Sequence, residues 1–324
     1  MSNGLKIVSC GASRVVGKRL RTKVAAALCG VLTAVSLSAR AVEIRIAVGA
    51  DPSFVAFFVA KQEKLFEKQG LDVKLLNFAG GGVMLDALPA GQAVMSASTE
   101  STTIVRMGRA DIRAVAIIGE SGDNLKLMAR KEIANPKGIK VFGVVPGGVF
   151  EYLNVLTSAK YGLDPSGMKT VKSGPPELPA LLVRGDIDAF WIFEPLASLT
   201  EKQGARVLAQ SKDVGYTYAT WVSAYGPWLK DNKADAEKVL KALAQACEIT
   251  TANPQKAAEA MHAQMKLPVA QSLEILKLMT CKARAFTDAD LKGYDAIADF
   301  LANSKITASR VKYRDLLDKD FYKP

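Results

Sequence analysis

The sequence predicts an α/β protein made of two similar halves followed by a helical C-terminal region. Short β-branched runs alternate with amphipathic stretches in the first half, and the same alternation starts again after Asn135-Pro136. From Tyr225 onward the apolar residues recur at helical spacing. Such alternation is typical of parallel strands joined by crossovers, and the two halves predict two lobes with a cleft between them.

Residues 1–41 are predicted to be a secretory signal peptide that is cleaved before Val42. They hold seven Lys or Arg residues and no acidic residue, and they include an uncharged run over residues 24–37. That run would rise about 21 Å as a helix, less than the roughly 30 Å of a bilayer core. Ala39-Arg40-Ala41 has the small-x-small pattern of a cleavage site, so we expect export by the general pathway.

The basic character of the chain is concentrated in this leader. The whole chain has 43 basic and 32 acidic residues, a net charge of +11, but residues 42–324 have 36 basic and 32 acidic residues. The mature protein would therefore be close to neutral for its length. A nucleic-acid partner is not expected.

The first half is predicted to contain four strands and two helices. Gly70 follows the first helix, in the position where a left-handed cap is favoured. The expected strands are residues 43–48, 71–78, 93–98 and 112–118, and the expected helices are residues 54–69 and 83–88.

The second half repeats this organisation, and the C-terminal region is predicted to be almost entirely helical. Its strands are expected at residues 139–145, 169–172 and 187–193, with helices after Gly148, over residues 177–184 and after Pro195. Four amphipathic helices are expected beyond Tyr225. A chain of this size with 49% hydrophobic residues can bury a large core.

The sequence contains no catalytic motif and predicts no enzyme and no cofactor. Its only histidine, His262, lies within a predicted helix and is interpreted as a surface or half-packed residue. No G-x-S-x-G elbow is present, and Gly80-Gly81-Gly82 lacks both the phosphate-loop ending and the dinucleotide spacing.

The cysteines leave one question open. Cys10 and Cys29 fall in the leader, so that Cys247 and Cys281 remain in the mature chain. In an oxidising compartment they form either one disulfide or two separate buried thiols. Two cysteines and one histidine do not predict a zinc site, and no metal is expected.

Two segments are candidates for ligand binding. In residues 145–152, VPGGVFEY, two glycines precede a helix start, where free backbone N–H groups and the helix dipole favour an anion. In residues 189–195, AFWIFEP, aromatic side chains and Glu194 lie at the carboxyl end of a strand, where ligands bind in open α/β sheets. The alternative is that these aromatic residues fill the core.

Three segments together resemble the substrate-binding proteins of ABC importers for nitrate, sulfonates and taurine, a superfamily that includes binders of thiamin pyrimidine precursors. They are residues 57–92, residues 144–165 and residues 182–195, in the order and near the spacing of that family. The resemblance covers essentially the whole mature chain. It implies a two-lobed periplasmic-binding-protein fold of the second type, with the C-terminal helices packed on the first lobe.

The resemblance also implies a function and a site. The first lobe would comprise residues 42–128 and 220–324, and the second residues 129–219. A small-molecule solute would be captured in the cleft by hinge closure and passed to an ABC permease of the inner membrane by a monomeric periplasmic protein. The strand-end residues that this implies as ligand contacts are Ser53, Phe54, Ser98, Thr99, Glu100, Ser121, Gly147, Gly148, Val149, Phe150, Trp191 and Glu194.

The class of solute stays open at this stage. Glu100, Glu120, Glu151 and Glu194 would repel a sulfonate or nitrate unless they face away from the site. A pyrimidine or another aromatic ligand with N–H donors is the alternative. An enzyme like the eukaryotic thiamin pyrimidine synthases would need a cysteine-rich iron motif, which this chain lacks.

Overall fold

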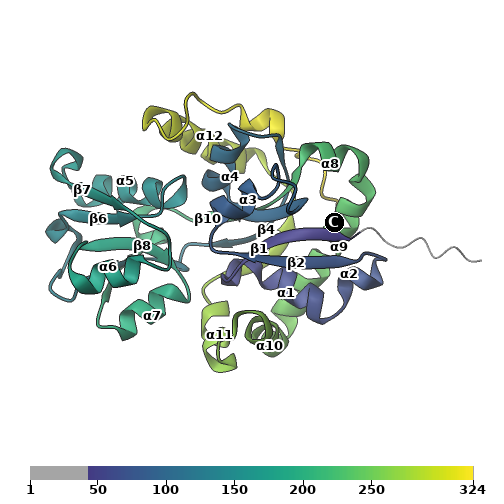
Figure 1. The fold of residues 1–324 in the computed structure, drawn as a ribbon, viewed down its shortest axis with the longest axis horizontal. Helices are drawn as coiled ribbons and strands as arrows, with labels where there is room; N and C mark the ends of the chain where they lie inside the picture. Colours follow the sequence, from purple (N-terminus) through teal and green to yellow (C-terminus); the bar gives the residue numbers. More distant parts are fainter. Residues whose placement is uncertain (1–42, 324) are drawn as a thin grey trace, which may run out of the picture. The chain divides into compact units, whose positions relative to one another are not determined.

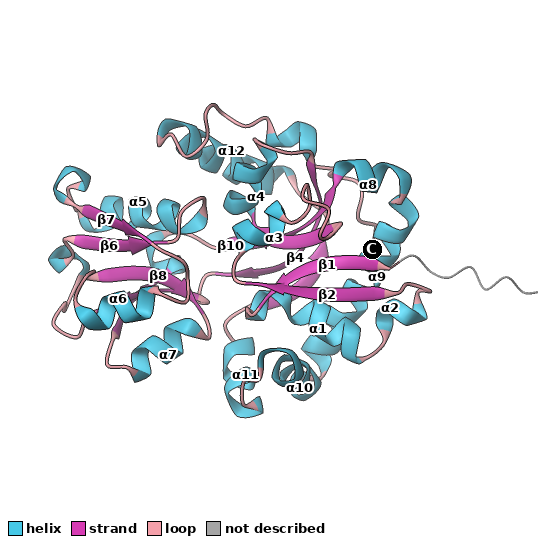
Figure 2. Ribbon diagram, in the orientation of Figure 1, coloured by secondary structure: helices cyan, strands magenta, loops and turns pink. Residues whose placement is uncertain are grey.

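The structure is a computed structural model that describes residues 43–323, and the predicted signal peptide and its cleavage site lie outside these residues. The described residues form one compact unit that contains two β-sheets (Figure 1). Helices cover both faces of each sheet (Figure 2). The predicted α/β class with two sheets and a helical C-terminal region is confirmed.

The first sheet has six strands in the order β11-β4-β10-β3-β1-β2. β1 pairs in parallel with β2 and β3, whereas β10 runs antiparallel between β3 and β4, and β11 runs antiparallel to β4. The strands are β1 (Ile44–Gly49), β2 (Val73–Phe78), β3 (Met95–Thr99), β4 (Ile112–Ser121), β10 (Tyr218–Tyr225) and β11 (Thr280–Arg284).

The second sheet has five strands in the order β7-β6-β8-β5-β9. β6 is parallel to β7 and β8, and β5 is antiparallel to β8 and β9. The strands are β5 (Leu125–Ala129), β6 (Val141–Val144), β7 (Lys169–Lys172), β8 (Ala189–Phe193) and β9 (Arg206–Gln210).

The seven strands predicted from the sequence are all present and mutually parallel, but four further strands were not predicted, and three of these run antiparallel. β5 and β10 each follow a passage of the chain from one sheet to the other, at residues 122–124 and 215–217. The chain reverses its direction at each passage, which explains why β5 and β10 pair antiparallel with their neighbours. The lobe boundaries expected at residues 128/129 and 219/220 lie inside β5 and β10, so the sheets change a few residues earlier.

The helices are arranged in layers on the two sheets. One face of the first sheet is covered by five helices: α1 (Val55–Gln62), α2 (Leu65–Lys68), α9 (Lys233–Ala252), α10 (Pro254–Met265) and α11 (Val269–Leu276) (Figure 1). The opposite face is covered by α3 (Gly81–Asp86), α4 (Glu100–Met107) and α12 (Asp288–Asn303). At one end of this sheet lies α8 (Gly226–Asp231). The second has α5 (Val149–Tyr161) opposite α6 (Leu178–Arg184) and α7 (Leu196–Lys202) (Figure 2). No described helix is long and apolar enough to cross a membrane.

The helix expected over residues 54–69 is divided. A short 3-10 helix (Pro52–Phe54) leads into α1, and the chain turns at Lys64, whose φ of 55° is left-handed, before α2 begins. The turn allows Leu65 and Phe66 to be buried. The left-handed cap predicted at Gly70 is confirmed by its φ of 76°.

The C-terminal region contains a strand as well as helices, contrary to the almost wholly helical prediction. β11 forms an edge of the first sheet, beside β4. A disulfide joins Cys247 of α9 to Cys281 of β11, with the two Cα atoms 5.0 Å apart. Of the two alternatives for these cysteines, the disulfide is therefore the one that the structure contains, and it fixes α9 to the edge of the sheet.

Candidate functional site

A cavity of about 290 Å³ lies where strand ends of the first sheet face loops of the second. The first sheet contributes the turns after β1, β2 and β3 and the start of β10, and the second contributes the loops after β6, β7 and β8. Carboxyl ends of parallel strands are where ligands bind in open α/β sheets, so this cavity is the candidate site.

One side of the cavity is rich in hydroxyl groups. Ser98 and Thr99 end β3, and Thr102 lies in the first turn of α4, where the Thr99 hydroxyl donates to Thr102 Oγ1 over 3.0 Å. Thr220 of β10 pairs in register with Thr99. The Oγ1 atom of Thr220 is buried without a hydrogen-bond partner in the protein, although the residue lines the cavity. A ligand in the cavity is the natural partner for this hydroxyl.

Asp51 is the one carboxylate among the described residues that line the cavity. It caps the 3-10 helix Pro52–Phe54, and its Oδ1 accepts the Ser53 N–H over 2.7 Å. Burial raises the pKa of Asp51 to about 6, against the lowering effect of the hydrogen bonds from Ser53. Asp51 is therefore a carboxylate that changes charge close to neutral pH.

A buried hydrogen-bond network lies next to Asp51 and includes its partner Ser53. The hydroxyls of Ser53 and Tyr218 are 3.0 Å apart, and Asn124 Nδ2 donates to the Tyr218 oxygen over 2.8 Å. The Asn124 side chain also accepts the backbone N–H of Glu194 over 3.3 Å. Both Asn124 and Tyr218 lie next to the passages between the sheets, so the network joins the site to the two connections.

The rest of the cavity lining is mostly apolar and includes four phenylalanines. Phe150 of α5 and Phe193 of β8 lie with their ring centroids 6.4 Å apart and their planes inclined by 30°. Their surfaces suit the hydrocarbon or ring portion of a small solute. The apolar lining residues are Phe54, Phe78, Met84, Leu125, Val145, Val149, Phe150, Pro175, Pro176, Phe193, Pro195 and Leu196.

The glycine turn before α5 lies directly against α4. Gly147 and Gly148 have φ values of 91° and 154°, and a Cβ on Gly148 would lie 2.5 Å from Thr102 Oγ1. Arg106 of α4 donates to the Gly147 carbonyl over 2.7 Å. These contacts bring the second sheet's loop onto the first sheet's helix, and they need glycine in this turn.

The glycine N–H groups themselves are already bonded. Glu151 Oε2 accepts from Gly147 N over 2.7 Å and from Gly148 N over 3.2 Å. The next two N–H groups, of Val149 and Phe150, have no acceptor within α5 because they belong to its first turn. An anion at this helix would therefore use Val149 and Phe150 rather than the two glycines.

Eight of the twelve residues expected to contact a ligand line the cavity. They are Ser53, Phe54, Ser98, Thr99, Gly147, Gly148, Val149 and Phe150. The other four, Glu100, Ser121, Trp191 and Glu194, lie behind its wall. Ser121 stabilises a turn instead, because its Oγ accepts the N–H groups of Asp123 and Asn124, and its hydroxyl donates to the Leu278 carbonyl over 2.6 Å.

Trp191 and Glu194 have structural partners away from the cavity. Trp191 is 0% exposed in the core, and its indole N–H donates to Thr157 Oγ1 over 3.0 Å. Glu194 is 1% exposed, forms an ion pair with Lys126 and accepts the backbone N–H of Ser198 over 3.1 Å. Phe193 and Pro195 are the residues of this segment that line the cavity.

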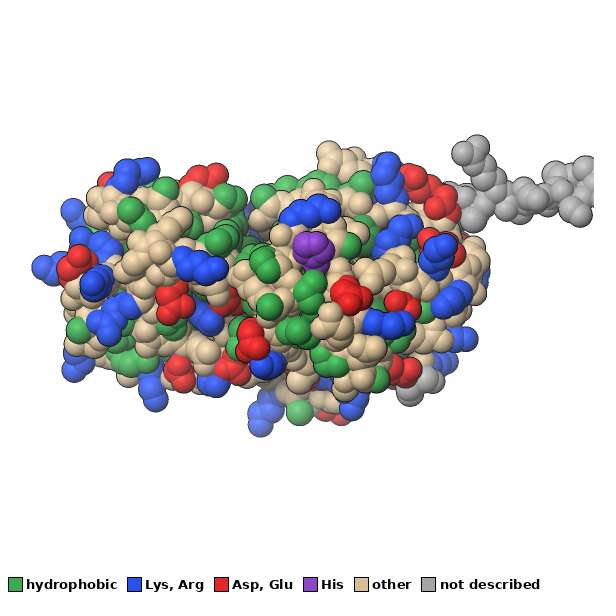
Figure 3. All heavy atoms as spheres, turned by 90° about the horizontal axis from the view of Figure 1, so that it is seen from below, with side chains coloured by type: hydrophobic (Ala, Val, Ile, Leu, Met, Phe, Trp, Pro, Cys, Tyr) green, Lys and Arg blue, Asp and Glu red, His purple; other side chains and the backbone are tan. Residues whose placement is uncertain are grey.

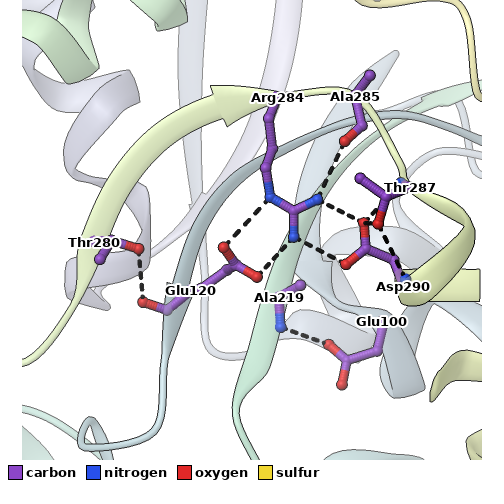
Figure 4. Close-up of polar contacts among 8 residues, drawn as sticks. All are labelled: Glu100, Glu120, Ala219, Thr280, Arg284, Ala285, Thr287 and Asp290. Atoms are coloured by element: carbon purple, nitrogen blue, oxygen red, sulfur yellow. Dashed lines mark hydrogen bonds and ion pairs between the residues drawn. The ribbon is translucent and has the colours of Figure 1, made fainter.

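None of the four glutamates that could repel an anion lines the cavity. Glu120 pairs with Arg284, which also binds Asp290, so that its carboxylate is held by a guanidinium outside the cavity (Figure 4). Glu100 accepts the Ala219 N–H over 2.9 Å and bonds to the Tyr216 hydroxyl, on the far side of α4's first turn. Burial raises the pKa of Glu100 to about 7 despite these hydrogen bonds.

The histidine prediction agrees with the structure. His262 is exposed on α10, and its Nδ1 lies 2.6 Å from the Leu267 carbonyl, where it stabilises the helix end. Figure 3 shows the histidine at the surface, on a face where basic and acidic side chains are interspersed.

The sequence analysis missed several residues of the site. Thr102, Asn124, Tyr218 and Thr220 line the cavity. Thr102 lies in a helix that was not predicted, and the other three flank or belong to β5 and β10, the strands that follow the two passages. Asn124 follows the turn-forming residues Ser-Gly-Asp, and this polar run could have indicated that the chain leaves the first sheet here.

Comparison with known proteins identifies the family of this chain. Residues 51–257 match the family described as NMT1/THI5 like. The taurine-binding periplasmic protein of Escherichia coli K12 is 25% identical over 67% of this chain and 68% of its own length. The alkanesulfonate-binding protein SsuA of Xanthomonas axonopodis pv. citri, solved with MOPS bound, has a TM-score of 0.76 at 19% identity over 85% of this chain and 98% of its own.

The periplasmic aliphatic sulphonate binding protein SsuA of Escherichia coli has a TM-score of 0.72 at 20% identity, over 85% of this chain and 96% of its own. The same fold also occurs in an enzyme. The desulfurization enzyme DSZB has a TM-score of 0.61 at 11% identity, over 86% of this chain and 97% of its own. These structures confirm the periplasmic-binding-protein fold for this chain.

Proposed function

This chain belongs to the NMT1/THI5 like family, and we propose that it is the extracytoplasmic solute-binding component of an ABC importer. Its solute is a small sulfonate-type compound, the class named for its relatives. The observation that carries this proposal is the mixed lining of the cavity, in which hydroxyl and backbone N–H groups lie among aromatic side chains. Polar groups of that kind suit a sulfonate head, and the aromatic side chains suit its organic body.

The position of three glutamates favours an anionic head group, because Glu100, Glu120 and Glu194 have partners behind the cavity lining. Glu151 remains at the start of α5, where it occupies the Gly147 and Gly148 N–H groups and leaves those of Val149 and Phe150 for an anion. The free N–H groups at the start of α4 and α5 and the hydroxyls of Ser98 and Thr102 are the proposed oxygen contacts. Proposed contacts of the organic portion are Phe78, Phe150 and Phe193.

The proposed mechanism is closure of the two sheets around the solute. The two chain passages, at residues 122–124 and 215–217, form the hinge. The hydrogen bond from Arg106 to the Gly147 carbonyl holds the two sheets together when they are closed. The closed protein, a monomer, would then be recognised by a permease in the inner membrane. No chemical conversion is proposed, because the one histidine lies on α10 and both described cysteines are in a disulfide.

A thermal-shift panel tests the function. The purified protein is unfolded and refolded to remove any bound solute, then heated with alkanesulfonates, taurine, nitrate and pyrimidines. A ligand at 1,000 times its Kd should stabilise the protein by about 4 kcal/mol, or roughly 8 °C at this size. A shift with sulfonates supports the proposal. A shift confined to pyrimidines would instead favour the aromatic N-containing solute, and conversion of a sulfonate during incubation would identify an enzyme.

A glycine variant tests the closure. Gly148→Ala should weaken sulfonate binding at least tenfold, because its Cβ would meet Thr102 at 2.5 Å. Gly204→Ala is the matched control, since Gly204 also has a positive φ, of 98°, but has nothing within 4 Å of the added Cβ. Equal binding by the two variants, measured by calorimetry, would contradict the proposed closure at this turn.

A further inference from the structure

The cavity contains a negative charge without a compensating cation. Asp51 lines it, and no Lys or Arg among the described residues does. The ion pairs found between residues 43 and 323 do not include Asp51. A plain sulfonate would thus place a second negative charge in the same enclosed space, which disfavours the ionised form of one of the two groups.

Capping of the short helix does not require this buried position. Asp164, in the segment Asp164-Pro165-Ser166, caps a second 3-10 helix with the same residue types and the same bond to the serine N–H, and it lies exposed at the surface. The buried location of Asp51 therefore needs a reason other than local structure.

A second group in the cavity also lacks a partner. Thr220 Oγ1 is unbonded in the protein, and the residue is only 1% exposed. It lies in β10 two residues beyond Tyr218, whose hydroxyl belongs to the same network as Ser53. An acceptor carboxylate and an unpartnered hydroxyl thus line one cavity, which offers an acceptor to N–H groups of a solute and a donor to its oxygens.

We propose that Asp51 binds an ammonium group of the solute, so that the site selects zwitterionic aminosulfonates over plain alkanesulfonates. This inference rests on the proposed function, and it assigns the two ends of the solute to two parts of the cavity. The sulfonate lies at the first turns of α4 and α5, close to Thr220, and the ammonium lies at Asp51. The cation balances Asp51, and the solute as a whole adds no net charge to the cavity.

Taurine and propane-1-sulfonate test the proposal because they differ by the exchange of an ammonium for a methyl group. Calorimetric titration at pH 7.5 should show that the refolded protein binds taurine at least tenfold more tightly. Asp51→Asn keeps an oxygen for the Ser53 N–H, and it should weaken taurine binding at least tenfold while leaving propane-1-sulfonate binding unchanged or tighter. Asp164→Asn is the matched control and should leave both affinities unchanged.

The possible outcomes separate this inference from the proposed function. If propane-1-sulfonate binds as tightly as taurine, or if Asp51→Asn weakens both ligands equally, the ammonium site is overturned while the sulfonate function stands. If neither compound binds to the refolded protein, the sulfonate class itself is wrong, and the ammonium assignment falls with it. Circular dichroism of both variants confirms that each is folded.

Discussion

The two Asp-Pro-Ser segments of this chain have the same local structure and opposite electrostatics. Asp51 and Asp164 each cap a 3-10 helix that begins with proline, and each accepts the N–H of the serine two residues later. Burial raises the pKa of Asp51 to about 6, whereas hydrogen bonds from Ser166 lower the pKa of Asp164 at the surface. Local sequence therefore determines the cap, and the surroundings determine the charge.

The serine hydroxyls differ in the same way. Ser166 Oγ lies 2.8 Å from both carboxylate oxygens of Asp164, so its hydrogen bonding is entirely local. Ser53 Oγ instead lies 3.0 Å from the hydroxyl of Tyr218, 165 residues further along the chain. One segment is a closed local motif, and the other is part of a long-range network around a cavity.

The largest expected effect is on stability at Asp51. Its raised pKa means that the ionised form is disfavoured in the folded state, so the folded protein should lose stability as the pH rises from about 4 to about 6. Asp51→Asn should remove that cost and raise the free energy of unfolding by about 2 kcal/mol at pH 8, with no gain at pH 3.5. Urea unfolding at the two pH values measures this, and equal effects at both would contradict the burial argument.

A smaller loss is expected when the network of Ser53 is cut. Tyr218→Phe leaves the fully buried Nδ2 of Asn124 without its acceptor and should reduce stability by about 1–2 kcal/mol. Ser166→Ala, which removes only a hydroxyl from the exposed segment, is the comparison. Similar unfolding midpoints in urea for the two variants would mean that the network does not stabilise the fold.

The binding of taurine and that of propane-1-sulfonate should depend on pH in opposite ways. Because taurine needs Asp51 ionised, its affinity should fall about tenfold between pH 7 and pH 5, as Asp51 takes up a proton. Two other ionisable groups act on Asp51: Tyr218 lines the cavity, and Glu194, which is paired with Lys126 behind the lining, raises the pKa of Asp51 by its charge. Propane-1-sulfonate should show the opposite trend, since protonation removes a repelling charge. Parallel titrations of both ligands across this range provide the measurement, and Asp51→Asn should abolish the difference in slope.

The smallest effect is expected at the exposed segment. The lowered pKa of Asp164 means that its stabilising contribution is present above its unfolded pKa and is lost on acidification. Asp164→Asn should therefore cause a slight destabilisation near neutral pH and none at pH 2, measured by the same urea experiment. A large loss at neutral pH would show that the local motif matters more than its exposure indicates.

The residues expected from sequence line the cavity where strand ends carried a local signal. The glycine turn before α5 and the ends of β1 and β3 were identified, because turns and β-branched runs are visible over a few residues. Trp191 and Glu194 were expected at the site because they lie at a strand end, yet they face the core and Lys126. Side-chain direction on a fully buried strand does not follow from an uninterrupted apolar run.

The sequence by itself determined the α/β class, the seven strands that were predicted and the helices of the C-terminal region. Each of these depends on residues that are close together in the chain. Only the tertiary structure decided that Cys247 meets Cys281, that Tyr218 meets Ser53, and that Asp51 but not Asp164 lies in a cavity. The contact of Tyr218 with Ser53 depends on the two passages between the sheets, which bring together residues 165 positions apart. The disulfide depends on the packing of α9 against β11, and the burial of Asp51 depends on the elements packed around it.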